Sequence, residues 1–422
     1  MNGLDREQVG DGLSFIADPV TFISDWLTSV LAGWGLAPGW VQFIMFVLGA
    51  GLLSLGAMIF TVFLIWLERK LGGRFQDRIG PNRVGPWGLF QPIADMVKIF
   101  TKEYITPFGS DPVLFNLAPI LAMSAVLAVW AVIPLSSTVY GVNINIGVLY
   151  LLAVGALGEL GIILAGFGSN NKYALLGGFR AVAMLISYEV PMAITLLIPV
   201  MLTGSMGLND IAGAQHIWFI LQAPVAAFVF FIASIAENGR APFDLIEADS
   251  EIVAGFNIEY SGLKFGMYYV ADFLHAFTAA LIFATIFLGG WRGPGAELYP
   301  VLGFVYLLIK TSLVYFLTIA IRFSLPRLRI DQMMAFNWKY LTPLALVSLL
   351  VTAVLDKVVP AGQGWLRIGA LLLVNLAVFI LADRLVSLNK KRKAATRLVV
   401  SQPRPVAVTL KETPAEIVEA GS

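Results

Sequence analysis

Acidic and basic side chains interrupt several of the longest apolar stretches of this chain. Glu159 and Glu189 lie in two neighbouring stretches, Asp272 lies in a third and Lys310 lies in a fourth. A charged side chain in the hydrocarbon of a membrane is costly, so such residues are retained mainly for function. Carboxylates in this setting take up and release protons when hydration or a neighbouring charge changes. We therefore interpret Glu159, Glu189 and Asp272 as members of a proton path.

The positions of Glu159 and Glu189 within their stretches suggest that the two carboxylates meet. At 1.5 Å of rise per residue, both lie roughly 10–14 Å below the membrane surface that carries their connector. They could then face each other or share one file of water. For any one of these residues, the alternative is a hydrogen-bond anchor between helices. For His275, which lies one turn from Asp272, the anchor is the favoured interpretation.

A second group of carboxylates lies in the segment 236–262. Asp244, Glu247 and Glu251 are spaced three and four residues apart, so they would share one face of a helix and repel one another. Such repulsion favours keeping some of them protonated, as a proton relay or charge switch requires. The alternative is a solvated acidic face. The segment is too apolar for a free loop, and we expect it to pack on the chain's own helices or on another subunit through Pro242, Phe243, Ile246, Ile252, Val253 and Phe256.

The segment 89–103 has the pattern of an amphipathic helix that lies on the membrane surface. Its polar face holds Gln91, Asp95, Lys98 and Lys102, and tight turns in 80–86 precede it. Its other face is formed by Phe90, Ile93, Val97 and Phe100. This helix is either a surface helix whose lysines reach water, or a helix whose polar face lines the mouth of a lipid-facing cavity. A third segment, 322–332, is rich in arginine and is interpreted as a basic partner surface.

The elements that must position these residues are membrane helices. The chain is 58% hydrophobic and 13% charged, whereas soluble domains carry roughly 25% charged residues. We predict an all-α integral membrane fold with about nine transmembrane helices plus cytoplasmic amphipathic helices. The predicted spans are 41–67, 113–135, 146–168, 182–203, 217–236, 268–290, 300–321, 340–359 and 366–386.

Lysine and arginine placement sets the expected orientation. With nine spans, the basic segments fall on one side, which predicts an N-terminus outside and a cytoplasmic C-terminus. No cleavable signal peptide is evident, because the start of the chain is acidic and broken by proline and glycine. We divide the chain into an N-terminal interfacial segment (1–39), a polytopic transmembrane domain (40–386) and a basic, disordered cytoplasmic tail (387–422).

The composition excludes several kinds of redox site. The chain has no cysteine and two histidines, so it cannot ligate an iron–sulfur cluster through thiolates or hold several bis-histidine haems. We predict no metal site and no cofactor bound by this chain, and no redox centre within it.

Four segments of this sequence strongly resemble the quinone-site membrane subunit of respiratory complex I, which is called the H subunit in bacteria and subunit 1 of the mitochondrial membrane arm. The similarity runs from about residue 40 to residue 386. The segments are ERKLGGRFQDRIGPNRVGPWGLFQPIADMVKIFTKE (68–103), SNNKYALLGGFRAVAMLISYEVPMA (169–193), APFDLIEADSEIVAGFNIEYSG (241–262) and RLRIDQMMAFNWKYLTPL (327–344).

The resemblance implies a subunit of a proton-translocating NADH:quinone oxidoreductase that forms the quinone-access tunnel and couples quinone reduction to proton translocation. It implies Arg69, Asp95 and Lys98 at the narrow part of the tunnel. It implies an acidic loop of Asp244, Glu247, Asp249 and Glu251, and a proton path of Glu159, Glu189 and Asp272. Family members commonly carry glutamate where this chain has Asp249 and Asp272, so the carboxylates here have a shorter reach.

The same resemblance implies partners and a location. The substrate is a quinone, either menaquinone or ubiquinone, while FMN and iron–sulfur clusters belong to partner subunits. The partners are the hydrophilic quinone-site subunits and the membrane-arm subunits of complex I, together with membrane lipid, and no nucleic acid. The expected location is a bacterial plasma (inner) membrane, crossed several times.

Two other functions remain open. One is the homologous membrane subunit of an energy-converting hydrogenase-type complex, which has no need of a quinone tunnel. The other is a secondary proton or cation transporter, which would purify alone rather than with many partners.

Overall fold

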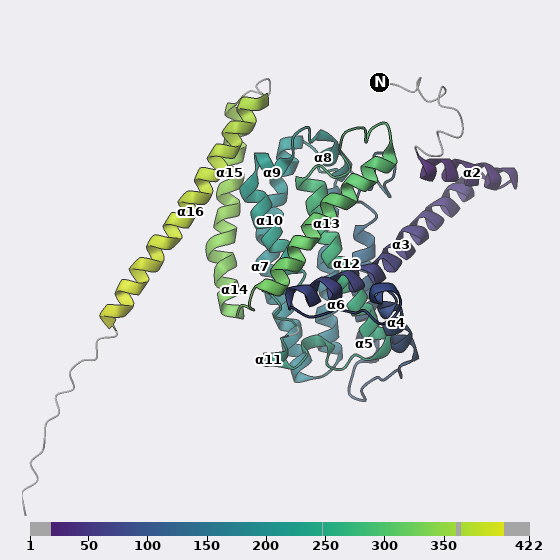
Figure 1. Cartoon of the computed structure of the whole chain (residues 1–422), viewed down its shortest axis with the longest axis horizontal. Coiled ribbons are helices and arrows are strands. Elements are labelled where there is room, and N and C mark those ends of the chain that lie inside the picture. The colour runs from purple at the N-terminus through teal and green to yellow at the C-terminus, as the bar shows by residue number, and fades with distance from the viewer. Residues whose placement is uncertain (1–17, 247, 360–363, 401–422) are drawn as a thin grey trace, which may run out of the picture. The chain divides into compact units, whose positions relative to one another are not determined.

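Every regular element is a helix in the part of the chain that the computed structural model describes, residues 18–246, 248–359 and 364–400 (Figure 1). This agrees with the predicted all-α membrane fold. The described chain falls into two compact units that divide after Leu376, and the candidate site residues all belong to the first. Glu247 lies outside the described residues, as do parts of the predicted N-terminal segment and tail.

Seven helical runs in the described residues are long and apolar enough to cross a membrane, and each covers one predicted span. The last run, Ile330–Val358, is interrupted by a π-helix. The runs are α3 (Pro38–Phe75), α5 (Pro112–Val129), α6 (Gly147–Gly168), α7 (Lys172–Thr203), α12 (Gly262–Phe287), α13 (Pro300–Ser324), and α14 (Ile330–Phe336) with η3 (Asn337–Leu341) and α15 (Thr342–Val358).

The prediction of one continuous helix over 217–236 is wrong. The stretch forms α9 (Phe219–Gln222) and α10 (Pro224–Glu237), which meet at Ala223. Pro224 explains the break, because a proline disfavours helical backbone angles in the residue before it. The ninth predicted span falls within α16 (Gly364–Val400). The remaining short helices are α2 (Pro19–Gly33), η1 (Pro86–Gly88), α4 (Gln91–Thr101), α8 (Leu208–Ala214), α11 (Asp249–Ile252) and η2 (Gly255–Asn257).

Local sequence signals fix where the helices begin. Asp111 accepts hydrogen bonds from the backbone N–H groups of Val113 (2.9 Å) and Leu114 (3.2 Å) at the start of α5. Asn171 caps α7 in the same way through Tyr173 N (2.9 Å). Such caps satisfy backbone donors that a helix start leaves free. Prolines occupy the first positions of α3, α5, α10 and α13, where a missing N–H costs nothing.

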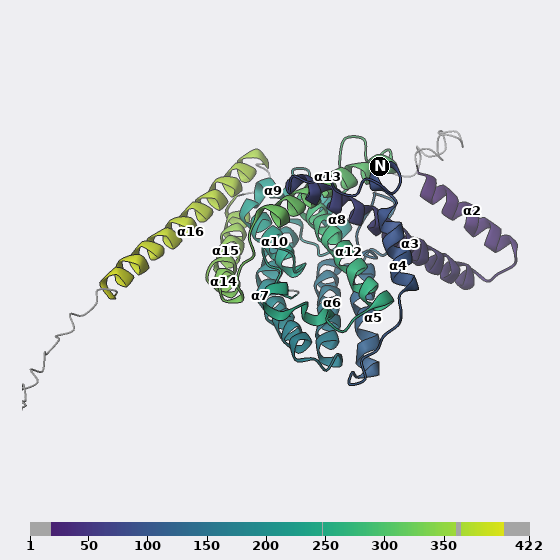
Figure 2. The ribbon, with the colours of Figure 1, turned by 60° about the horizontal axis from the view of Figure 1, so that its bottom comes forward.

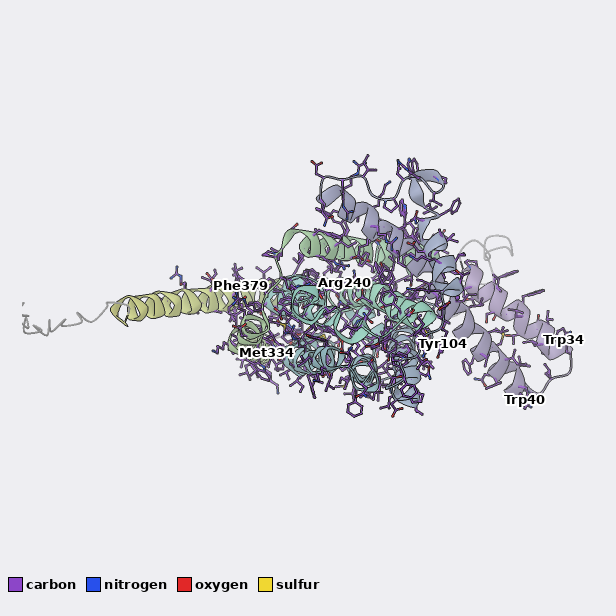
Figure 3. The ribbon with its side chains drawn as sticks, turned by 90° about the horizontal axis from the view of Figure 1, so that it is seen from below. Trp34, Trp40, Tyr104, Arg240, Met334 and Phe379 are labelled. Carbon is purple, nitrogen blue, oxygen red and sulfur yellow. The ribbon has the colours of Figure 1, made fainter. Side chains whose placement is uncertain are left out.

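Helix α12 lies at the centre of the bundle. Of its most apolar window, 78% is buried, against 6% for α3. It packs against α3, α5, α10 and α13. Figure 2 shows α2 and the first half of α3 side by side and apart from the other helices. Many apolar side chains of this region are exposed, among them Trp34 and Trp40 (Figure 3), whereas Leu31 and Val41 are buried.

The connectors predicted to be cytoplasmic gather at one end of the bundle. Figure 1 shows α4, α11 and α14 toward one end, and α8 and α9 toward the other. Backbone hydrogen bonds tie these connectors together, from Asp111 N to Gly168 O (2.9 Å) and from Leu328 N to Pro242 O (2.9 Å). The arrangement agrees with the predicted topology, whereas the sidedness itself stays a prediction.

Candidate functional site

A cavity of about 400 Å³ opens between α5, α6, α12 and the segment that follows α10. Its apolar wall comes from small residues of α5 and from aromatic residues of α12. The ionisable side chains that line it are Glu159, Glu237, Arg240, Asp244, Tyr268, Tyr269, Asp272, His275 and Arg322. We call it the large cavity. Most of its ionisable groups come from elements far apart in sequence, so the fold and not one motif assembles it.

Arg240 is the central cation of this region, and Figure 3 shows it within the helix bundle. It is buried and donates to Glu68 Oε2 (2.6 Å) and to Asp272 Oδ2 (2.9 Å). Glu68 also accepts from Tyr315 (3.0 Å) and pairs with Arg322. Although burial opposes its charge, neighbouring Asp272 holds the pKa of Arg240 above its usual value. We call these five residues the ion network. It connects the end of α3 to the middle of the large cavity.

A second, smaller cavity joins three carboxylates from three helices. Glu159 of α6, Glu189 of α7 and Glu237 at the end of α10 line it, and its volume is about 10 Å³, the size of about one water molecule. Glu159 Oε2 is buried and has no protein partner. Gly155 makes room for this arrangement, because a Cβ there would lie 3.3 Å from Glu237 Oε1. Glu159 and Glu237 line the large cavity as well.

The small cavity brings Glu159 and Glu189 together, although the depth prediction rested on a wrong helix start. Helix α7 begins at Lys172, not at 182, so Glu189 lies further along its helix than expected. The two helices already pack near their connector, where Gly166 of α6 lies against Ala174 and Gly178 of α7. The two carboxylates therefore line one cavity without lying equally far from that connector. Asp272 lies apart from the small cavity, with 44% of its side chain exposed in the large cavity.

Three helices converge at the predicted tunnel residues. Arg69 of α3 pairs with Asp95 of α4 and donates to the Tyr269 hydroxyl of α12 (3.4 Å). Lys98 lies 3.7 Å from Asp95 and its side chain is 71% exposed. The apolar side chains on the opposite face of α4 are exposed, which agrees with a helix lying against lipid. Asp95 therefore faces α3, whereas the side chain of Lys98 stays largely exposed beside it.

The acidic segment does not present one charged helix face. Asp244 pairs with Arg327 (2.9 Å), and Glu251 pairs with Arg180 of α7 (2.6 Å). Only the short helix α11 is helical here, and it begins at Asp249, whose side chain lies outside the described part, as does Glu247. The apolar side chains of this segment explain its irregular backbone, because burying them requires the chain to leave a regular helix. The apolar residues buried against the chain's own helices are Phe243, Leu245, Ile246, Ile252 and Phe256, whereas Val253 is exposed.

Several predicted charges serve the fold. Lys310 donates to Gly290 O (2.9 Å) and Arg292 O (2.8 Å) beyond the end of α12, which is the role of an anchor. In the basic segment 322–332, Arg322 pairs with the buried Glu68, whereas Arg327 pairs with Asp244 at an exposed position and Arg329 is exposed. The basic partner surface on this segment stays a prediction.

Sequence reasoning missed Glu68, Glu237 and Arg240. All three lie where an apolar stretch ends, and charged residues at that position usually face water. The signal that could have found them is their position beside glycine and proline in ENGRAP (237–242) and at the head of ERK (68–70). Among the described residues, no cluster of three histidine or acidic side chains could hold a metal ion.

Comparison with known proteins gives a family match and several similar proteins. The family model described as NADH dehydrogenase matches residues 48–353. A relative from Dehalococcoides mccartyi, named as the H subunit of NADH-quinone oxidoreductase, is 45% identical over 354 residues, 84% of this chain and 98% of the relative. Proteins of the same name match from Brevibacillus brevis (44% identity, 75% of this chain, 95% of the relative) and Bacteroides thetaiotaomicron (41%, 79% and 96%).

Proposed function

Because the chain belongs to the NADH dehydrogenase family, as a membrane subunit of the H type, we propose that it forms the quinone-access passage of an NADH:quinone oxidoreductase and couples quinone reduction to proton translocation. The chain is a multi-pass membrane protein and contributes to an enzyme complex without a redox centre of its own among the described residues. Its partners are other subunits of that complex, which supply the electrons.

One observation carries the coupling half of this proposal. Glu159 and Glu237 line both the large cavity and the small cavity, so the two cavities share carboxylates that lie between Asp272 in one and Glu189 in the other. Because one water molecule fills a cavity of this size, a proton can pass between these carboxylates without crossing dry packing. A set of structural hydrogen-bond anchors would not need to share cavities.

The quinone half rests on the convergence of α3, α4 and α12. A quinone carries an apolar tail and two carbonyl acceptors, so its passage must offer both lipid access and donors. The exposed apolar face of α4 provides the lipid access. The donors are the side chains of Lys98, Arg69 and Tyr269, and Asp95 holds the two cations in place. Quinone enters here from the bilayer and moves toward the partner subunit that reduces it.

The ion network links the two halves. Reduction of quinone to quinol takes up two electrons from the partner subunit and two protons. Side chains beside the passage that give up these protons become more negative. Glu68 directly precedes Arg69 in the chain and pairs with Arg240, whose other partner is Asp272. A charge change at the passage therefore changes how strongly Arg240 pairs with Glu68 and with Asp272. Asp272 passes the change to Glu237 and Glu159, and Glu189 passes it to the neighbouring membrane subunits.

The remaining parts of the proposal concern location. The acidic loop comprises Asp244, Glu247, Asp249 and Glu251, of which Asp244 pairs with Arg327 and Glu251 with Arg180. We place this end of the bundle in the cytoplasm of a bacterium, facing the hydrophilic subunits, with the N-terminus outside. We also propose an interfacial segment at 1–39, in which α2 exposes apolar side chains, and a basic cytoplasmic tail at 387–422, whose first part up to Val400 continues α16 and is not disordered.

Two variants in the assembled complex, reconstituted into vesicles, separate the two halves of the function. Lys98→Ala removes a donor that binds quinone equally in the ground and transition states, so the apparent KM for quinone should rise about threefold to tenfold with kcat unchanged. Glu189→Gln keeps the side-chain size and removes the exchangeable proton, so protons moved per quinone reduced should fall about tenfold or more, since that proton has no other carrier. The KM of Glu189→Gln should stay at its wild-type value.

Glu297→Gln is the matched control, because Glu297 is 75% exposed and lines neither cavity. It should leave both quantities unchanged. An unchanged KM for Lys98→Ala with intact assembly would remove Lys98 from the passage. Wild-type proton yield in Glu189→Gln would exclude the proposed coupling route.

A further inference from the structure

Helix α7 has a gap in its backbone hydrogen bonding next to Glu189. Pro191 lies inside the helix and has no N–H to donate to the carbonyl of Ser187, one turn earlier. Ser187 is fully buried, so water cannot satisfy that oxygen. Glu189 lies between Ser187 and Pro191, within the interrupted turn. The direction of its side chain therefore depends on how far α7 bends there.

Asn337 supplies the missing donor from another helix. Its side-chain amide donates to Ser187 O, and the residue is fully buried. The Ser187 hydroxyl meets Met334 Sδ of α14 (2.8 Å), and Met334 appears in Figure 3. Asn337 begins the π-helix Asn337–Leu341, which packs against α7. A π-helix carries one extra residue per turn and occurs mostly at functional sites. Here it brings the amide to the carbonyl that Pro191 leaves free.

The position of this amide leaves one of its own buried atoms without a partner. Asn337 Oδ1 is buried and has no hydrogen-bond partner, and a buried acceptor without a partner destabilises a fold. An alanine at 191 would satisfy Ser187 O from within α7 and would make this amide unnecessary. The chain instead keeps both the proline and a half-satisfied asparagine at the turn that carries Glu189.

We infer that Asn337 is a positioning residue for Glu189. Its amide, bonded to Ser187 O, fixes the bend of α7 at Pro191 and so directs the Glu189 carboxylate into the small cavity that it shares with Glu159 and Glu237. The inference rests on the proposed role of Glu189. It adds a second helical run, α14 to α15, to the elements that control the proton path.

Asn337→Leu in the assembled complex tests this inference, because leucine has a similar volume and no donor. Protons moved per quinone reduced should fall about tenfold, since small misplacements of a reacting group have effects of this size or larger. The matched control is Asn375→Leu. Asn375 is also fully buried and donates to Leu371 O (2.9 Å), but it lines neither cavity. Both variants should lower the temperature at which the complex loses activity, and the control should keep its proton yield.

A double variant distinguishes positioning from plain hydrogen-bond satisfaction. Asn337→Leu with Pro191→Ala restores a backbone donor to Ser187 O and removes the proline ring, so α7 straightens. Thermal stability should recover, while the proton yield should stay low because the bend is lost. If Asn337→Leu alone does not assemble, the double variant is judged by the same yield.

Three outcomes decide the matter. A normal proton yield in Asn337→Leu, or recovery of yield together with stability in the double variant, would overturn the inference. A normal yield in Glu189→Gln, measured in the same preparation, would overturn the proposed function instead. A low yield in both Asn337 variants beside a normal yield in Asn375→Leu supports the positioning role.

Discussion

Replacing Arg240 by methionine is expected to cause the largest loss of any single substitution in this chain. Arg240 is buried between Glu68 and Asp272, and methionine removes the cation that they share. Breaking a fully buried ion pair from one side costs about 3–5 kcal/mol, and solvent around the 44% exposed side chain of Asp272 lowers that cost here. Arg322 still neutralises Glu68, so the loss falls mainly on Asp272 and on the geometry of the large cavity. The amount of assembled complex in the membrane and its temperature of inactivation measure this loss.

A double variant tests whether the uncompensated charge of Asp272 causes the loss of assembled complex. Arg240→Met combined with Asp272→Asn removes the uncompensated charge, so assembly should recover in part. Proton translocation should not recover, because the carboxylate that receives the charge change is gone. Arg367→Met is the matched control, since Arg367 pairs with Asp356 away from both cavities and its loss should leave coupling intact. Normal assembly and normal coupling in Arg240→Met would show that the ion network does not connect the quinone passage to the proton path.

Glu237→Gln is expected to abolish most proton translocation while the complex still assembles. Glu237 lines both cavities, as Glu159 does, so it is one of the two carboxylates through which the large cavity reaches Glu189. Glutamine keeps the volume and the hydrogen-bonding capacity of the side chain but cannot release a proton at physiological pH. The yield of protons per quinone reduced should therefore fall about tenfold or more, which corresponds to a barrier higher by about 1.4 kcal/mol.

A neighbouring carboxylate provides the control for Glu237. Glu259 accepts a hydrogen bond from Asn171 (2.7 Å) and lines neither cavity, so Glu259→Gln should preserve the proton yield. Glu237→Asp should retain part of the yield, because the proton remains and only the reach is shorter. If Glu237→Gln pumps as well as Glu259→Gln, protons reach Glu189 by another route.

The spans could be predicted from sequence because each needs only a long apolar run. The failures occurred where one residue overrides that run. Pro224 splits the fifth predicted span into α9 and α10, although the stretch remains apolar throughout. Helix α7 starts at Lys172 because Asn171 caps it, while the charged Lys172 and Arg180 in its first turns hid this start from a search for uninterrupted apolar residues.

The site could be predicted only where a charge stands out against apolar neighbours. Glu159, Glu189 and Asp272 do so, and all three line the cavities. No such contrast marks Glu68, Glu237 and Arg240, because a charge at the end of a span normally faces water. Only the packing of α3, α10 and α12 shows that these ends are covered. The pairing of Asp244 with Arg327 and of Glu251 with Arg180 was out of reach for the same reason.

Locating ordered water in the complete enzyme complex is the most direct test of the central claim. A density map at a resolution that reveals bound solvent should contain a water molecule among Glu159, Glu189 and Glu237, in contact with at least two of them. Further water should connect it to Asp272 through the large cavity. A map in which side chains close the space between these carboxylates, with no solvent on either side of Glu237, would contradict the account.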